Sequence, residues 1–377
     1  MLFASTQSAI GGIVLFAALV IVISYAWINI RQGRGEVGSE IELAPNRKPY
    51  YSDEELEGKK LDRTLTYGLV GLFVVAITLP LYWLNEPARQ EGAVKDFNTA
   101  FVKRGAGMFD TTENQGFNCA FCHGGMSAEG GITPFTITDS NGEFVKQVNW
   151  RGPALNTVLQ RYTREEVRYV LTYGRTYSPM PAWGVKGGGP LNDQQIQNLI
   201  DYIESIQITP EESQAAVADA VAEEMKAAET AGVPYASEGE AMFNLGYYTG
   251  FAGGAYACGR CHTTGWSYGE KGPDGNGALG PSLRGGVSTT RFPGSVAGFT
   301  QQVDFICAGS ELGVNYGRNA QGTGRMPGFC SVPAEPQSSP ETGEVGVEAK
   351  EPTDPETVGG MYSKDDVEKI VRYVRGL

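Results

Sequence analysis

Two pentapeptides in this chain combine cysteine and histidine at a spacing that suits one kind of chemistry. They are Cys119-Ala120-Phe121-Cys122-His123 and Cys258-Gly259-Arg260-Cys261-His262. Both read C-x-x-C-H, the pattern in which two thiols form thioethers to a haem and the histidine binds its iron. The chain has only two histidines, and each lies in one of these motifs. The motifs therefore predict two covalently bound haem c groups.

Zinc binding and thiol redox chemistry are the alternatives for such cysteines. A structural zinc site is closed by four ligands, and each cysteine pair here already has its own histidine, so a shared site would have surplus ligands. A redox C-x-x-C does not require a following histidine. Because the two motifs use every histidine of the chain, both alternatives are disfavoured.

The histidine count also limits the ligand on the opposite side of each iron. Methionine sulfur is the natural remaining partner, and His/Met ligation raises the reduction potential. Met180 and Met326 stand out because each is followed by proline, a small residue and an aromatic residue. Proline has a fixed φ and suits a rigid loop. Most methionines fill cores, which is the expectation for Met108, Met126, Met225, Met242 and Met361.

The residues around the two motifs follow one plan. A G-x-x-M-F segment precedes each motif, a G-P-x-L segment follows it, and the Met-Pro loop comes next. Residues 191–203 align without gaps to residues 362–374, with apolar residues on one face of a predicted amphipathic helix. The chain therefore contains an internal repeat that closes with a helix in both copies.

This order of segments resembles class I cytochrome c over about residues 95–208 and 235–377. The resemblance implies an all-α fold of two tandem cytochrome c domains, preceded here by two transmembrane helices. It also implies that His123 and His262 are held by the carbonyls of Pro153 and Pro281, and that Met180 and Met326 complete the two iron sites. A partner on the ring nitrogen opposite the metal is expected for any metal-bound histidine.

Two further segments differ in composition from these regions. Residues 209–234 are rich in Ala and Glu and are predicted to form a helical linker, with Thr209 as N-cap, Pro210 at its first position and Gly232 at its end. The second copy carries additional residues at about 331–358. These are rich in Pro, Glu, Ser and Gly, and are expected to form a solvated acidic insertion.

Residues 1–94 are predicted to be a membrane anchor. Uncharged apolar stretches cover residues 9–30 and 65–84, and with a rise of about 1.5 Å per residue each can cross a hydrocarbon core of about 30 Å. A signal peptide, the alternative for the first stretch, has a basic region before its apolar run, and no Lys or Arg precedes Arg31. Two transmembrane helices are therefore expected.

The loop between these helices, residues 31–64, is rich in Lys and Arg. The positive-inside rule assigns such a loop to the cytoplasm. The N-terminus and both haem domains then lie on the extracytoplasmic side of a bacterial cell membrane, where covalent haem attachment is also expected.

Cys307 and Cys330 lie outside the motifs and flank Met326. In an oxidising compartment they can form a disulfide, which would contribute about 3 kcal/mol in the chain-entropy model and clamp the Met326 loop. Two separate buried thiols are the alternative.

The net charge of −13 is concentrated in the linker and the second copy. It disfavours nucleic-acid binding. The acidic side chains could steer a basic electron-transfer partner or simply solvate the surface.

Two irons that are each closed by protein ligands predict an electron-transfer subunit of an oxidoreductase complex rather than a catalyst by itself. The chain resembles membrane-anchored dihaem cytochromes c, and in particular the cytochrome c subunit of actinobacterial-type cytochrome bcc complexes. That resemblance implies a respiratory chain with a cytochrome b and a Rieske protein as partners and a haem–copper oxidase as acceptor. The alternative resemblance is to the dihaem subunit of cbb3-type oxidases.

Two other classes of function are weighed against electron transfer. A dihaem peroxidase needs one displaceable ligand and an acid–base group above the haem, and no further histidine exists for that role. A structural subunit with vestigial haems would not need two intact ligand sets.

Overall fold

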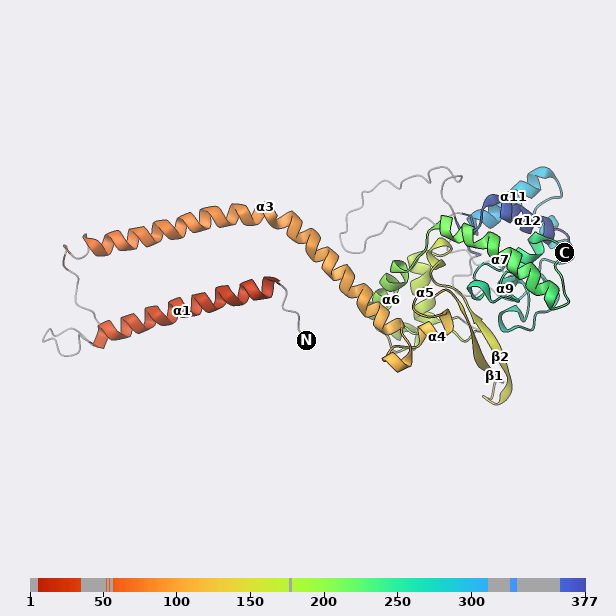
Figure 1. Ribbon diagram of the computed structural model, residues 1–377, viewed down its shortest axis with the longest axis horizontal. Coiled ribbons are helices and arrows are strands. Elements are labelled where there is room, and N and C mark those ends of the chain that lie inside the picture. The colour runs from red at the N-terminus through yellow and green to blue at the C-terminus, as the bar shows by residue number, and fades with distance from the viewer. Residues whose placement is uncertain are drawn as a thin grey trace. The chain divides into compact units, whose positions relative to one another are not determined.

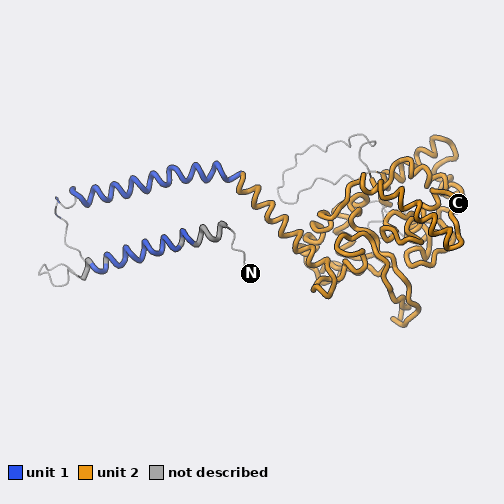
Figure 2. The backbone as a smooth tube through the Cα atoms, in the orientation of Figure 1, with its two compact units in different colours: residues 1–87 blue, residues 88–377 orange. Residues whose placement is uncertain are grey.

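The computed structural model describes residues 6–34, 52, 54, 57–175, 178–310, 326–330 and 360–377 (Figure 1). The chain divides into two compact units, residues 1–87 and 88–377 (Figure 2). Both C-x-x-C-H motifs lie in the second unit. The predicted acidic insertion and most of the predicted cytoplasmic loop lie outside the described residues.

The predicted spans coincide with two helices, α1 (Thr6–Arg34) and α3 (Lys59–Phe109). Within the described residues, α3 is the helix long and apolar enough to cross a membrane, and α1 contains a shorter apolar stretch, Phe16–Ile28. Large apolar side chains of α3 are exposed, including Phe73 and Trp83. Such exposure is stable in lipid rather than in water, so α3 has the properties of a membrane anchor.

The first copy of the repeat, residues 95–208, will be called the first region. The end of α3 leads into it, and its elements are η1 (Thr112–Asn114), α4 (Cys119–His123), β1 (Gly131–Thr138), β2 (Phe144–Gly152), η2 (Val158–Gln160), α5 (Arg164–Tyr173), η3 (Val185–Gly187) and α6 (Asp193–Ser205). Helix α6 confirms the predicted closing helix, and its capping box joins Asn192 and Gln195.

The all-α expectation is wrong for residues 131–152, where β1 and β2 pair as an antiparallel hairpin from Gly131↔Gly152 onward. Both strands are rich in β-branched and aromatic residues, which favour extended structure. The turn is closed by the Asp139 carboxylate, which accepts the backbone N–H groups of Asn141 and Glu143. These residues lie outside the repeat pattern, so the resemblance to a helical family did not predict them.

The linker helix α7 (Pro210–Thr230) confirms the helical prediction, with a capping box at Thr209 and Pro210 at its first turn. The second region, residues 235–377, follows it. Its elements are α8 (Glu238–Phe243), η4 (Phe251–Gly254), α9 (Gly259–His262), η5 (Trp266–Tyr268), α10 (Val287–Arg291), α11 (Val296–Ala308) and α12 (Lys364–Val374). Helix α12 confirms the second predicted closing helix.

The two regions repeat one helix crossing. A Cβ at Gly105 of α3 would overlap the backbone of Asn198 in α6, and one at Gly239 of α8 would overlap the backbone of Lys369 in α12. Next to each glycine an aromatic pair bridges the two helices. The ring centroids are 5.2 Å apart for Phe109 and Tyr202, and 5.5 Å apart for Phe243 and Tyr373. Each crossing requires glycine, because only a residue without Cβ permits this approach.

Linker helix α7 is fastened to the second region by a buried carboxylate, Glu224, whose side chain is fully buried. Its oxygens accept the backbone N–H groups of Gly246 (3.2 Å), Tyr248 (2.9 Å) and Thr249 (3.0 Å). The hydroxyls of Thr249 (2.6 Å) and Tyr235 (3.3 Å) donate to it as well. The linker is therefore a packed part of the second region.

We expect Glu224→Ala to lower the free energy of unfolding by about 3 kcal/mol or more, because each buried donor left unsatisfied costs about 1–3 kcal/mol. Denaturant unfolding followed by far-UV circular dichroism measures the change. Glu223→Ala, at the exposed neighbouring position, is the matched control and should unfold as the wild type does. Equal midpoints for the two variants would contradict the anchoring role of Glu224.

Candidate haem-binding site

Helices α4 and α9 hold the cysteines and histidines of the two motifs in single helical turns. Helix α4 comprises Cys119–His123, and α9 comprises Gly259–His262 with Cys258 as its N-cap. Residues three and four positions apart lie on one face of a helix. Each motif therefore presents its two thiols and its imidazole on the same side of the backbone.

Each imidazole is held by the carbonyl of a distant proline. The Nδ1 atom of His123 lies 2.8 Å from the carbonyl oxygen of Pro153, and the Nδ1 atom of His262 lies 2.8 Å from that of Pro281. Because a carbonyl only accepts, Nδ1 carries the proton and donates it. Burial lowers the pKa of both histidines, so the neutral rings keep Nε2 as a free ligand atom for a metal.

The glycine before each of these prolines allows the backbone to pass close to the motif. A Cβ at Gly152 would overlap the carbonyl oxygen of Cys122, and a Cβ at Gly280 would lie 2.6 Å from Cε1 of His262. The two residues of each G-P dipeptide thus have different roles. Glycine permits the close approach, and proline supplies the acceptor.

The two Met-Pro loops have the same construction in both regions. Gly174 is the C-cap residue directly after α5, and Gly309 is the C-cap residue directly after α11, both with positive φ. The next backbone N–H donates to the methionine carbonyl, from Arg175 to Met180 (3.0 Å) and from Ser310 to Met326 (3.0 Å). The sequence analysis did not single out Gly174 and Gly309, although a glycine directly after a helix is a recognised end signal.

A single cavity of about 750 Å³ brings the predicted site residues together. Its wall includes both pairs of motif cysteines, both histidines, both methionines and Pro153. Pro281 does not line the cavity, although Leu279 two positions before it does. Much of the remaining wall is apolar, contributed by Phe109, Val158, Val167, Leu171, Trp183, Leu199, Ile203 and Phe329. A nitrogen ligand, a sulfur ligand and two thiols around apolar space fit a covalently bound haem.

The cysteines lack the electrostatics of a redox pair. Burial raises the pKa of the Cys119 thiol to about 12 and that of the Cys258 thiol to about 12. Thiol–disulfide chemistry needs the opposite, a lowered pKa that stabilises the thiolate. The environment of the Cys119 and Cys258 thiols therefore disfavours redox exchange.

The other two cysteines and the methionines Met126, Met242 and Met361 lie in a disulfide, in the core or near the surface. Cys307 and Cys330 are joined by a disulfide, which connects the end of α11 to the segment after Met326. Met242 and Met361 are buried in the core of the second region. Met126 is partly exposed, and its carbonyl accepts the hydroxyl proton of Tyr202.

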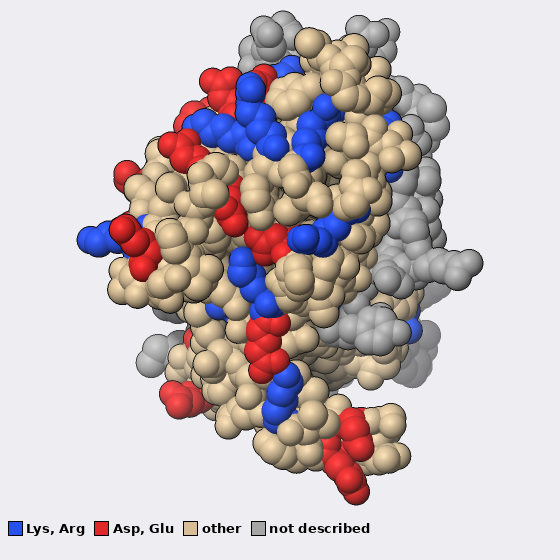
Figure 3. All heavy atoms as spheres, turned by 90° about the vertical axis from the view of Figure 1, so that its right-hand side faces the viewer, with Lys and Arg blue, Asp and Glu red and all other residues tan. Residues whose placement is uncertain are grey.

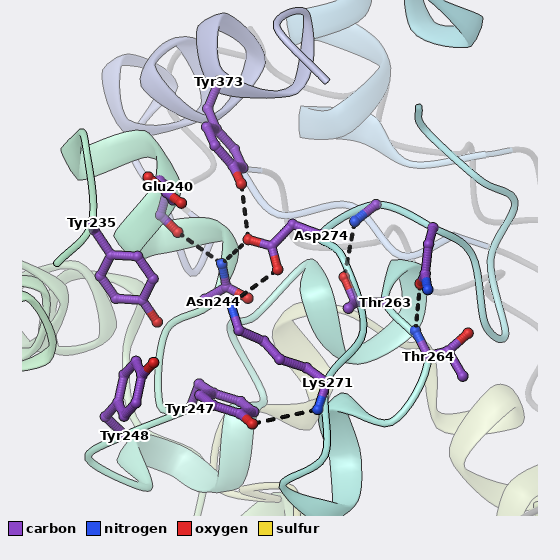
Figure 4. Close-up of polar contacts among 12 residues, drawn as sticks. Tyr235, Glu240, Asn244, Tyr247, Tyr248, Thr263, Thr264, Lys271, Asp274 and Tyr373 are labelled. Atoms are coloured by element: carbon purple, nitrogen blue, oxygen red, sulfur yellow. Dashed lines mark hydrogen bonds and ion pairs between the residues drawn. The ribbon is translucent and has the colours of Figure 1, made fainter. Parts of the chain in front are cut away.

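A polar network steadies the loop that follows the second motif (Figure 4). The Asp274 carboxylate accepts from Asn244 Nδ2 (2.6 Å) and the Tyr373 hydroxyl (2.8 Å), and pairs with Lys271 Nζ (3.0 Å). The backbone N–H of Gly275 donates to the Thr263 hydroxyl at 3.0 Å, directly after His262. The Lys271–Asp274 pair is local in sequence, but Asn244 and Tyr373 come from separate elements, so no local spacing indicates their contacts with Asp274.

Comparison with known proteins identifies one part of this arrangement. Residues 102–203 match the family model described as cytochrome C oxidase, cbb3-type, subunit III. No curated protein and no solved structure matches the chain. The matched segment runs from the end of α3 into α6 and contains Cys119, Cys122, His123 and Met180. Residues 102–203 are a c-type cytochrome domain, which binds haem c covalently.

Proposed function

We propose that the chain is a membrane-tethered dihaem cytochrome c that passes single electrons on the extracytoplasmic side of a respiratory chain. The observation that carries this proposal is the shared cavity, whose wall contains two complete sets of two cysteines, one histidine and one methionine. The first set belongs to the c-type cytochrome domain. The second set follows the same construction.

Three correspondences support a second cytochrome c domain at residues 235–377. The proline carbonyl lies 2.8 Å from the histidine Nδ1 in both regions. A positive-φ glycine precedes both Met-Pro loops. In both regions an equivalent glycine permits the close helix crossing, of α3 with α6 and of α8 with α12. A duplicated domain explains all three, since convergence on one motif would not reproduce contacts far from it.

Counting the haems tests this proposal directly. The pyridine haemochrome assay on the purified full chain should give two haems per polypeptide. The double variant Cys258→Ala/Cys261→Ala, which removes both thioethers of the second motif, should give one. A wild-type value of one haem would overturn the dihaem proposal.

The proposed ligands Met180 and Met326 favour electron transfer over catalysis. An iron bound by histidine on one side and methionine on the other has no free position for a substrate, and such ligation gives a high reduction potential. The chain would then relay electrons between larger partners. We propose that α1 and α3 both span the membrane and hold the haem-bearing unit beside those partners.

The family match favours a haem–copper oxidase of the cbb3 type as a partner, because the matched model describes a subunit of that enzyme. A cytochrome bcc-type complex, with a cytochrome b and a Rieske protein on the donor side, is the finer assignment, which rests on the resemblance to the dihaem cytochrome c subunit of such complexes. Acidic and basic side chains are interspersed on the face seen in Figure 3.

Extraction in a mild detergent followed by identification of co-purifying subunits distinguishes these complexes. A haem–copper oxidase without other partners would support the cbb3-type assignment. Additional recovery of a cytochrome b and a Rieske protein would support the bcc-type assignment. Recovery of the chain alone, with full haem content, would contradict stable membership of either complex.

A further inference from the structure

Two arginines reach across between the regions in opposite directions. Arg260, inside the second motif, donates through Nη1 to the carbonyls of Arg151 (2.9 Å) and Gly253 (2.8 Å). Arg161, in the first region, donates through Nη1 to the carbonyl of Ala255 (3.0 Å), just upstream of Cys258. Arg151 itself immediately precedes the Gly-Pro segment that holds His123. Each arginine therefore contacts the backbone beside the other region's motif.

Both side chains line the shared cavity, together with Arg175 from the Met180 loop. Within the described residues, neither Arg175 nor Arg260 forms an ion pair with a carboxylate. The position that matches Arg260 in the first motif is Phe121, whose side chain is exposed. A C-x-x-C-H motif thus does not require an arginine at this position, and the positive charge of Arg260 is specific to the second copy.

Arg260 keeps its positive charge at neutral pH. Burial, together with the nearby charges of Arg175 and Arg161, lowers the pKa of Arg260 to about 10. A pKa of about 10 still leaves the guanidinium protonated at pH 7.

We propose that Arg161 and Arg260 form a crossed pair that couples the two haem sites and raises the reduction potential of both irons. The inference rests on the proposed dihaem function. Reduction removes one positive charge from an iron, so a nearby cation favours the ferrous state. The charges of buried Arg161 and half-buried Arg260 are screened by salt less than exposed charges are. Haem carboxylates could pair with these arginines. Loss of an arginine would then leave negative charge behind, which lowers the potentials in the same direction.

The test is a spectroelectrochemical titration of the full-length chain in detergent, after its haem content has been measured. In Arg260→Gln both midpoint potentials should fall, with each ferric–ferrous equilibrium constant changing about tenfold, which is about 59 mV for one electron. Arg372→Gln is the matched control, since it removes an exposed arginine paired with Glu368 outside the cavity. Its two potentials should stay at the wild-type values.

Two further variants separate charge from packing. Arg260→Lys retains the positive charge and should keep both potentials near those of the wild type. Arg161→Gln removes the other member of the pair, which also lines the cavity, and should lower both potentials even if Arg260→Gln fails to retain haem. The inference is overturned if Arg161→Gln and any haem-loaded Arg260→Gln match the control, or if only one of the two midpoint potentials changes. A wild-type chain that carries one haem would overturn the proposed function as well.

Discussion

Replacing Met180 by alanine should open the iron of the first region to exogenous ligands. The methionine sits on a loop that lines the cavity with His123, and its carbonyl is fixed by the N–H of Arg175. Removing the thioether takes away the proposed sixth ligand without disturbing that backbone bond. The ferrous variant should bind CO rapidly at one haem, whereas the wild type should bind none.

Visible absorption spectra before and after CO addition measure the effect. Met225→Ala is a suitable control, because Met225 lies on α7 and does not line the cavity. An unchanged low-spin spectrum in Met180→Ala would refute the ligand assignment. Rapid CO binding by the wild-type protein would instead favour an enzyme with an open haem, such as a peroxidase, over a closed electron carrier.

Replacing Met326 by histidine should retain the second haem but lower its midpoint potential by on the order of 100 mV or more, because axial ligands set haem potentials over a range of about 0.8 V. Imidazole is a stronger donor than a thioether and stabilises ferric iron, which is why His/Met ligation gives the higher potential. The disulfide between Cys307 and Cys330 connects the segments on either side of Met326, so the substituted side chain should stay at the same place in the loop.

Redox titration monitored by absorbance checks this expectation, and one of the two midpoint potentials should shift. Met242→Leu, a substitution in the core of the second region, should leave both waves in place. A Met326→His protein with two unmoved waves would show that Met326 does not bind the iron.

Local chemistry of the site could be read from the sequence. The C-x-x-C-H spacing requires only one turn of helix to bring two thiols and an imidazole to one face, and α4 and α9 are such turns. The amphipathic period of the closing helices is equally local, and α6 and α12 follow it. The iron-binding roles of Met180 and Met326 remain predictions, although both residues line the cavity.

The sequence did not predict the hairpin of β1 and β2, because these strands lie outside the segments that both copies share. Within the described residues, the hairpin occurs in only one copy. The end of the hairpin away from its turn carries Arg151, which donates to the carbonyl of Tyr247 in the second region at 2.6 Å. A contact between residues so far apart depends on how the two regions pack, and no short-range pattern encodes it.

The sequence by itself indicated haem attachment at residues 119–123, a second C-x-x-C-H motif at residues 258–262, and which residues are candidate iron ligands, because covalent attachment and ligation depend on residue type and short spacing. Only the tertiary structure showed that both sets of candidate ligands line one cavity. It also showed that Arg161 and Arg260 each donate a hydrogen bond to the backbone of the other region. Those features arise from packing between distant segments, where burial removes solvent screening and lets a charge from one region act on the other.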